Sequence, residues 1–161
     1  AVPLLGALAG NALVDGQQDL PHPELGDLEG PGAMATADAV WIPNRNGVLL
    51  NLAAAVAEAH SLEVVVVGFN KEEAATFPDN SSDYLGALNA CFEYSTRGSV
   101  RVESPTLEMS KVELYAAGMA VGAPLGVTWS CYDGGEAPCR QCESCRRRAR
   151  AEEAFAASRE G

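Results

Sequence analysis

The chain has 161 residues, of which 47% are hydrophobic and 20% are charged, and its formal net charge is −11. This length and composition are typical of one globular domain with a substantial core. The negative charge argues against a protein that binds a nucleic-acid backbone, because such proteins need a basic surface. No apolar run approaches the ~20 residues that span a bilayer, and no signal-peptide pattern is recognised, so we expect a cytoplasmic protein.

The first part of the chain shows little regular pattern. Residues 1–39 are rich in glycine, proline and acidic residues, which favours a long loop or lid, with simple disorder as the alternative. Residues 39–42 then predict a short strand that ends at Pro43.

A helix is predicted over residues 48–60, where apolar residues recur at helical spacing. Residues 62–67 follow as a run of β-branched side chains without polar alternation. Such a run is typical of a central strand that is covered on both faces of a parallel sheet.

The second half of the chain continues the alternation. We predict helices over residues 81–94, 110–122 and 143–157, and strands over residues 100–102 and 127–129. The first of these helices carries Cys91 on its apolar side, where a free cysteine usually acts as a small buried hydrophobe. The whole pattern predicts an α/β fold, a Rossmann-like three-layer parallel sheet within a single domain, 1–161.

Ligands of such sheets bind beyond the carboxyl ends of the strands, and the loops there are polar or aromatic. Arg45 lies at the start of a helix, where its guanidinium can bind an anion together with the backbone N–H groups. The alternative is that it is an ordinary surface arginine in a turn. Lys111 lies in the first turn of a helix, where its positive charge is unfavourable because the helix dipole is also positive at that end. A phosphate bound at the helix end would remove this conflict. The amides of Asn46 and Asn70 are further candidate ligands of a nucleotide-like molecule.

Three more residues of these loops have two interpretations each. Asp79 is suited to accept hydrogen bonds from a base or to position a metal-bound phosphate, but it also fits a helix cap. Phe77 and Trp129 fit a sandwich around a flat heterocycle, and the alternative is that they plug the edge of the core.

Four cysteines form a C-x7-C-x2-C-x2-C pattern near the end of the chain, at Cys131, Cys139, Cys142 and Cys145. The two-residue spacers let the sulfurs point at one centre, and their overlap leaves little room for disulfides. We therefore predict a closed, structural Zn²⁺ site within a C-terminal element, 129–161.

The basic run 146–150 is interpreted as a solvated helix face that offsets the thiolate charge, rather than as an RNA contact. His22 and His60 are interpreted as structural.

Several segments together resemble the 7-cyano-7-deazaguanine synthase family. They are residues 4–13, Ile42-Pro43-Asn44-Arg45-Asn46, residues 68–73, residues 76–81, Ser110-Lys111-x-Glu113, and Trp129-Ser130-Cys131-Tyr132 with the three following cysteines. The resemblance covers nearly the whole chain, and the cysteine pattern with its Trp-Ser-Cys-Tyr lead is its most specific part.

The resemblance implies an ATP-dependent carbon–nitrogen ligase of queuosine biosynthesis, with an adenine nucleotide α-hydrolase-like fold. Such an enzyme converts 7-carboxy-7-deazaguanine and ammonia to the nitrile preQ0, with Mg²⁺-ATP as cosubstrate. By this resemblance Arg45 and Lys111 contact the ATP phosphates or the acyl-adenylate. The residues that hold the deazaguanine are then Asn46, Asn70, Phe77, Asp79 and Trp129.

One departure from the family pattern affects the expected activity. The family carries an N-terminal strand and an S-G-G-x-D-S loop that grips pyrophosphate, and this sequence has no such motif. We therefore expect a chain that is truncated relative to the family and inactive alone, with an exposed sheet edge that favours a homodimer. The alternatives are a non-catalytic zinc-containing module that binds a deazapurine or a protein, and a related ligase for another acid, which the Phe77-Pro78-Asp79 loop disfavours.

Overall fold

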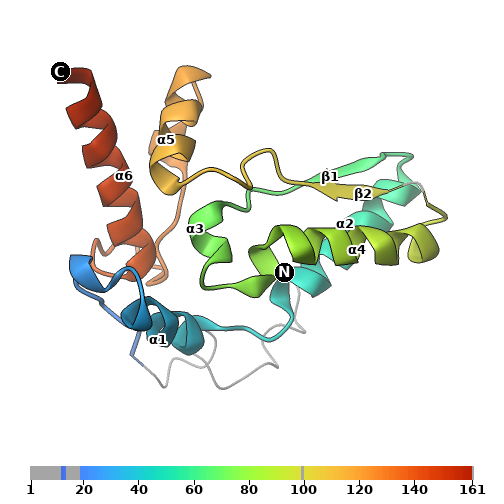
Figure 1. The fold of residues 1–161 in the computed structure, drawn as a ribbon, viewed down its shortest axis with the longest axis horizontal. Coiled ribbons are helices and arrows are strands. Elements are labelled where there is room, and N and C mark those ends of the chain that lie inside the picture. The colour runs from blue at the N-terminus through green and yellow to red at the C-terminus, as the bar shows by residue number, and fades with distance from the viewer. Residues whose placement is uncertain (1–11, 14–18, 99, 161) are drawn as a thin grey trace. The chain divides into compact units, whose positions relative to one another are not determined.

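The computed structural model describes residues 12–13, 19–98 and 100–160 (Figure 1). Its contacts divide the chain into two compact units, residues 44–110 and residues 1–43 with 111–161. The fold is α/β, rich in helices and with a small parallel sheet. The elements, in chain order, are η2 (Leu25–Asp27), α1 (Pro31–Val40), α2 (Arg45–Ala59), β1 (Val64–Val66), α3 (Lys71–Ala74), η3 (Pro78–Asn80), α4 (Ser82–Ser95), β2 (Arg101–Glu103), α5 (Lys111–Ala120), η4 (Leu125–Val127) and α6 (Glu143–Glu160).

The unit of residues 44–110 is built on the pairing of β1 with β2. The two strands are parallel, with Val65 opposite Val102, so the chain needs a crossover between them, which α3, η3 and α4 supply. Helices α2 and α4 lie along one face of this sheet (Figure 1). The core between them consists of Leu50, Ala54, Ala57, Leu85, Leu88, Phe92, Val100 and Val102.

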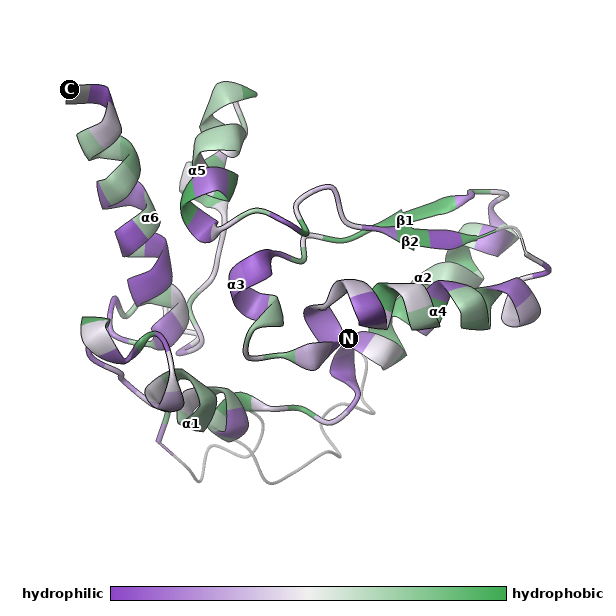
Figure 2. Cartoon of the chain, viewed as in Figure 1, coloured by the Kyte–Doolittle hydropathy of each residue, from purple (hydrophilic) through white to green (hydrophobic). Residues whose placement is uncertain are grey.

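Helix α2 and strand β1 bury only part of their apolar surface. Leu50, Ala54 and Ala57 of α2 are buried, whereas its Leu49, Leu52 and Val56 side chains are exposed. Strand β1 is strongly hydrophobic (Figure 2), and yet Val66 is 66% exposed. Within the described residues, the expectation of a central strand covered on both faces is therefore wrong.

Helix α4 begins at the residue expected from its cap. The Ser81 hydroxyl accepts a hydrogen bond from the Tyr84 backbone N–H at 3.2 Å, which satisfies one of the free donors of the first turn. Leu85, Leu88 and Phe92 form the buried face. Cys91 is exposed, so the prediction that it is a buried hydrophobe is wrong. Cys91 is one residue before Phe92, so its side chain points about 100° away from that of Phe92 around the helix axis and lies outside the buried face.

The outer edge of β2 is bonded by a side chain instead of a further strand. The Asn89 side chain, from α4, accepts a hydrogen bond from the Val102 N–H at 2.7 Å and donates one to the Val102 carbonyl at 3.0 Å. Val102 is buried, so water cannot replace these bonds.

Replacing Asn89 with alanine is expected to destabilise residues 44–110 by about 2–4 kcal/mol, because each buried backbone group left unpaired costs about 1–3 kcal/mol. Asn51→Ala is the matched control. Asn51 is exposed on α2 and donates to the Gly47 carbonyl at 2.8 Å, and its loss should change stability by less than about 0.5 kcal/mol. Urea unfolding followed by amide hydrogen exchange within this unit measures both, and equal effects would contradict the assignment.

In the other unit, residues 31–40 form α1 instead of the end of a loop followed by a strand. Pro31 lies at its first turn, and alternate alanines give it a high helix propensity. The strand predicted at residues 39–42 is wrong, because the helix continues to Val40 and only Trp41 is extended. Residues 1–11 and 14–18 of the predicted lid lie outside the described residues.

Helices α5 and α6 pack side by side (Figure 1). Tyr115 and Phe155 meet edge to face, with ring centroids 5.6 Å apart. All residues of α5, Tyr115 included, are half-buried or exposed, so the expected core face of this helix is not fully covered. The strand predicted at residues 127–129 is also wrong, because the one-turn helix η4 occupies Leu125–Val127.

The arginines that begin α6 hold the segments around them. Arg147 is buried, forms a 2.7 Å ion pair with Glu143 and also donates to the Leu28 carbonyl. Arg148 donates to the Thr128 carbonyl at 2.8 Å and to the Leu125 carbonyl at 2.9 Å. The prediction that this basic run is a solvated face is therefore wrong for these two side chains.

Within the part of the chain that the structure describes, each helix is too short or too polar to cross a lipid bilayer.

Candidate functional site

The loops that follow β1 and β2 are joined at the carboxyl ends of the two strands. The hydroxyls of Ser104 and Thr106 donate to the Phe69 carbonyl at 2.9 and 2.7 Å. The Lys71 N–H donates to the Met109 carbonyl at 3.0 Å. The loops that follow β1 and β2 are thus tied together at the edge of the sheet where open α/β sheets bind their ligands.

Asn70 and Phe77 stabilise the loop that follows β1. The Asn70 side chain caps α3 by accepting a hydrogen bond from the Glu73 N–H at 3.2 Å, and it is buried. Phe77 is also buried, and its N–H donates to the Glu73 carbonyl at 2.8 Å. In this structure both residues fix the loop, and the Phe77 ring is not presented to solvent.

Asp79 lies against the start of α2. The Asn46 side chain donates to the Asp79 main-chain carbonyl at 3.4 Å, and the Asn80 side chain donates to its carboxylate at 3.2 Å. Burial raises the pKa of Asp79 above its ordinary value of 3.8, although the nearby Arg45 charge and hydrogen bonds partly offset the effect. The pKa of Tyr84 is raised as well, first by burial and then by the Asp79 charge. A carboxylate with a perturbed pKa beside an arginine is a recognised mark of functional sites.

The turn that presents Arg45 and Asn46 is sterically constrained. Asn44 has a left-handed backbone with φ of 53°. A Cβ added to Gly47 would lie 2.0 Å from the Asn44 side-chain oxygen. A side chain at position 47 would have to push the Asn44 side chain aside, so glycine lets that side chain pack against the first turn of α2.

Lys111 and Trp129, the two remaining predicted ligand residues, belong to the other unit. Lys111 is the first residue of α5 and is half-buried. Trp129 is 51% exposed, and its indole N–H donates to the Cys131 carbonyl at 2.9 Å. It borders a cleft of about 560 Å³, within the usual size range of small-molecule sites, that Arg140 and Arg148 also line.

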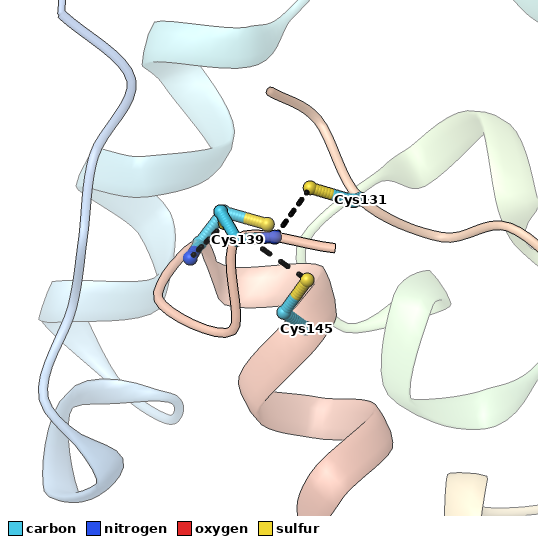
Figure 3. Close-up of side chains that lie close together, drawn as sticks. Cys131, Cys139 and Cys145 are labelled. Atoms are coloured by element: carbon cyan, nitrogen blue, oxygen red, sulfur yellow. Dashed lines mark hydrogen bonds between the residues drawn. The ribbon is translucent and has the colours of Figure 1, made fainter. Parts of the chain in front are cut away.

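The four predicted metal ligands converge. The sulfurs of Cys131, Cys139, Cys142 and Cys145 all lie within 4.8 Å of one another. Figure 3 shows three of them pointing toward a common centre, with 4.0 Å between the sulfurs of Cys139 and Cys145. Sulfurs at the corners of a tetrahedron around Zn²⁺ lie about 3.8 Å apart, because each Zn–S bond is about 2.3 Å long.

Backbone donors surround these sulfurs in the manner that thiolates require. Cys131 Sγ accepts from the N–H groups of Asp133 and Cys139 at 3.4 and 3.3 Å. Cys139 Sγ accepts from those of Gln141 and Cys142 at 3.4 and 3.3 Å. The geometry and the donor chemistry therefore fit a tetrahedral zinc ion.

The ion-free thiols differ in acidity. The backbone hydrogen bond from Cys139 lowers the pKa of Cys131 to about 7, although burial opposes the shift. Burial raises the pKa of Cys139, and it raises the pKa of Cys145 to about 12. Of these three thiols, Cys131 is the most readily ionised.

Sequence reasoning missed the residues that support the sites by hydrogen bonds to backbone groups, such as Asn89 and Arg148. Asparagine in a helix and arginine in a basic run carry no periodic signal. In contrast, Gly47 directly after Asn-Arg-Asn was a readable sign of a constrained turn.

Comparison with known proteins shows the family. A family model described as "Queuosine biosynthesis protein QueC" matches residues 1–156. A 7-cyano-7-deazaguanine synthase of Methanosarcina mazei is 48% identical over 151 residues, which cover 91% of this chain and 65% of the relative. The proteins of the same name from Pelotomaculum thermopropionicum and Methanosarcina barkeri are 48% and 54% identical over 151 and 117 residues. Those matches cover 93% and 73% of this chain, and 68% and 51% of the relatives.

The chain thus spans about two thirds of the length of the Methanosarcina mazei relative. Because the family match extends over nearly all of its residues, the chain belongs to the QueC family of queuosine biosynthesis proteins.

Proposed function

We propose that this chain is part of a 7-cyano-7-deazaguanine synthase, a carbon–nitrogen ligase that makes preQ0 for queuosine biosynthesis. The observation that carries the proposal is the family match over residues 1–156, together with relatives of that name. The substrates are 7-carboxy-7-deazaguanine, ammonia and Mg²⁺-ATP. Adenylation of the substrate carboxylate releases pyrophosphate, ammonia displaces AMP to give the amide, and a second ATP-dependent step removes the amide oxygen to give the nitrile.

The residues around Asp79 have a defined part in this chemistry. The Asp79 carboxylate accepts hydrogen bonds from N–H groups of the deazaguanine at a position that is already partly buried, and this burial raises its pKa. Asn46, Asn70 and the buried Phe77 hold the loop geometry, and the exposed Trp129 supplies a flat surface. Arg45 and Lys111 neutralise phosphate charge as the acyl-adenylate forms and reacts.

A structural role is proposed for zinc. The four cysteine thiolates bind one Zn²⁺, as their convergence and their backbone donors support. With all four coordination positions filled by protein, the ion contributes folding free energy and no chemistry on the substrate.

The remaining assignments follow the family. We propose a Rossmann-like three-layer fold of the adenine nucleotide α-hydrolase type, and a single domain over 1–161 with its zinc element at 129–161. A reduced four-cysteine cluster suits the cytoplasm. Small molecules are the partners, with a homodimer as the assembly and no nucleic acid or membrane involved.

A chimera tests the proposed activity. The part of the Methanosarcina mazei relative that this chain does not align with is joined to this chain, and nitrile formation from the acid, ammonia and ATP is followed by mass spectrometry. We expect the chimera to form preQ0 and the chain alone to form none. An inert chimera that folds and binds zinc, assayed beside an active relative, would refute the proposal.

The same chimera tests the role of Asp79. Asp79→Asn should raise KM for the deazaguanine acid strongly, while Glu108→Gln, an exposed carboxylate of the same unit, should leave it unchanged.

A further inference from the structure

A second group of metal-ligating side chains lies on the solvent-facing side of the four-cysteine cluster. His22, Asp133 and Cys139 offer ligand atoms that all lie within 4.8 Å of one another. His22 and Asp133 are exposed and Cys139 is half-buried, whereas the other three cysteines are buried. The sequence interpretation of His22 as a purely structural residue did not anticipate these neighbours.

Asp133 is held at this position by the loop that forms the cysteine site. Its backbone N–H donates to Cys131 Sγ at 3.4 Å. A carboxylate oxygen of its side chain lies within 4.8 Å of the Cys139 sulfur.

The Asp133 carboxylate therefore lies close to a sulfur of the four-cysteine site. A Zn²⁺ with four thiolates already carries a net negative charge, and like charges a few ångströms apart repel. A cation bound between Asp133 and Cys139 removes the repulsion, and His22 supplies a neutral nitrogen ligand from the other side.

We propose that His22, Asp133 and Cys139 bind a second divalent zinc ion, which shares the Cys139 sulfur with the ion of the four-cysteine site. Nitrogen, carboxylate oxygen and sulfur are the ligands that Zn²⁺ uses in proteins, and three protein ligands leave one position for water. The mixed set with a thiolate disfavours Mg²⁺ and Ca²⁺, which prefer oxygen ligands alone.

The second site should be the weaker of the two. It is exposed, it has fewer protein ligands, and its sulfur is shared with another ion. An ion bound in this way exchanges readily with ions in solution while the four-cysteine site stays filled. The inference rests on the proposed zinc site and not on the ligase activity.

Metal counting tests the inference directly. The purified full chain is stripped of metal, titrated with zinc and measured by native mass spectrometry, and with ¹¹³Cd²⁺ by NMR. We expect the wild type to bind a second equivalent at least about tenfold more weakly than the first. A second ¹¹³Cd resonance, from mixed sulfur, nitrogen and oxygen ligands, should accompany the resonance of the four-sulfur site.

His22→Ala and Asp133→Ala should each lose the second equivalent and its resonance while the four-sulfur resonance remains, which also shows that the variants fold. His60→Ala is the matched control, since His60 is exposed at the end of α2 in the other unit. A wild type that stops at one equivalent overturns the inference, as does a second equivalent that survives both variants or disappears in the His60 control. Because no outcome depends on turnover, failure here is distinct from failure of the proposed activity.

Discussion

Replacing Cys142 with serine is expected to abolish zinc binding and to unfold the surroundings of the metal site. Cys142 is fully buried, and its N–H donates to the Cys139 sulfur at 3.3 Å, so no other side chain can take its place. Structural zinc sites supply apparent binding free energies of about 10–16 kcal/mol, and much of that is folding free energy. The binding free energy that is lost with one thiolate ligand should therefore exceed the whole free energy of unfolding of a domain of this size, about 5–15 kcal/mol.

Cys91→Ser is the matched control, because Cys91 is an exposed cysteine in the other unit. Zinc content by elemental analysis and tryptophan fluorescence report the result. Both tryptophans, Trp41 and Trp129, belong to the unit that contains the cysteines, so fluorescence follows this unit selectively. Full zinc content in Cys142→Ser, or equal losses in both variants, would refute a four-cysteine site.

Breaking the buried ion pair of α6 is the second large effect that we expect. Glu143 and Arg147 lie 2.7 Å apart, and their side chains are only 4% and 7% exposed. Removing the Glu143 charge takes away the ion-pair partner of a buried guanidinium, and breaking a buried pair in this way typically costs about 3–5 kcal/mol. Glu143→Gln should therefore destabilise the unit of residues 1–43 and 111–161 by about that amount.

The pair Arg101–Glu103 provides the control, since its side chains are 53% and 51% exposed. Glu103→Gln should change stability by at most about 1 kcal/mol, as is usual for exposed pairs. The double variant Glu143→Gln with Arg147→Met should recover part of the loss, because it removes both charges. Urea unfolding of the zinc-loaded protein measures the effects, and a cost of Glu143→Gln below about 1 kcal/mol would show that the pair is not important.

The sequence indicated most helices well, because their apolar residues recur in register with the helical turn. Helices α2, α4, α5 and α6 begin and end within a few residues of their predicted bounds. The four-cysteine site was equally readable, because its spacing is set by the geometry of one ion.

The strand predictions at residues 39–42 and 127–129 failed for a physical reason. Val40, Trp41, Val127 and Thr128 have side chains that favour strands, but a strand forms only where a partner offers backbone hydrogen bonds. The alanine-rich segment before Trp41 satisfied its own backbone as α1 instead. Residues 125–127 formed a single helical turn, η4.

The positions of Arg147, Asn89 and His22 could not be predicted, because each depends on a contact with residues distant in sequence. Arg147 bonds the Leu28 carbonyl, and Asn89 bonds Val102. Such pairs have no local spacing, so only the folded chain reveals them.

The amide of Asn89 also limits how the small sheet can grow. A strand that docks beside β2 must first displace a side chain that already occupies the outward N–H and C=O groups of Val102. Among the described residues, no strand pairs with the far side of β1. Extension of the sheet, whether by more of this protein or by a second copy, is therefore directed to β1, and accidental fibre-like pairing through β2 is discouraged.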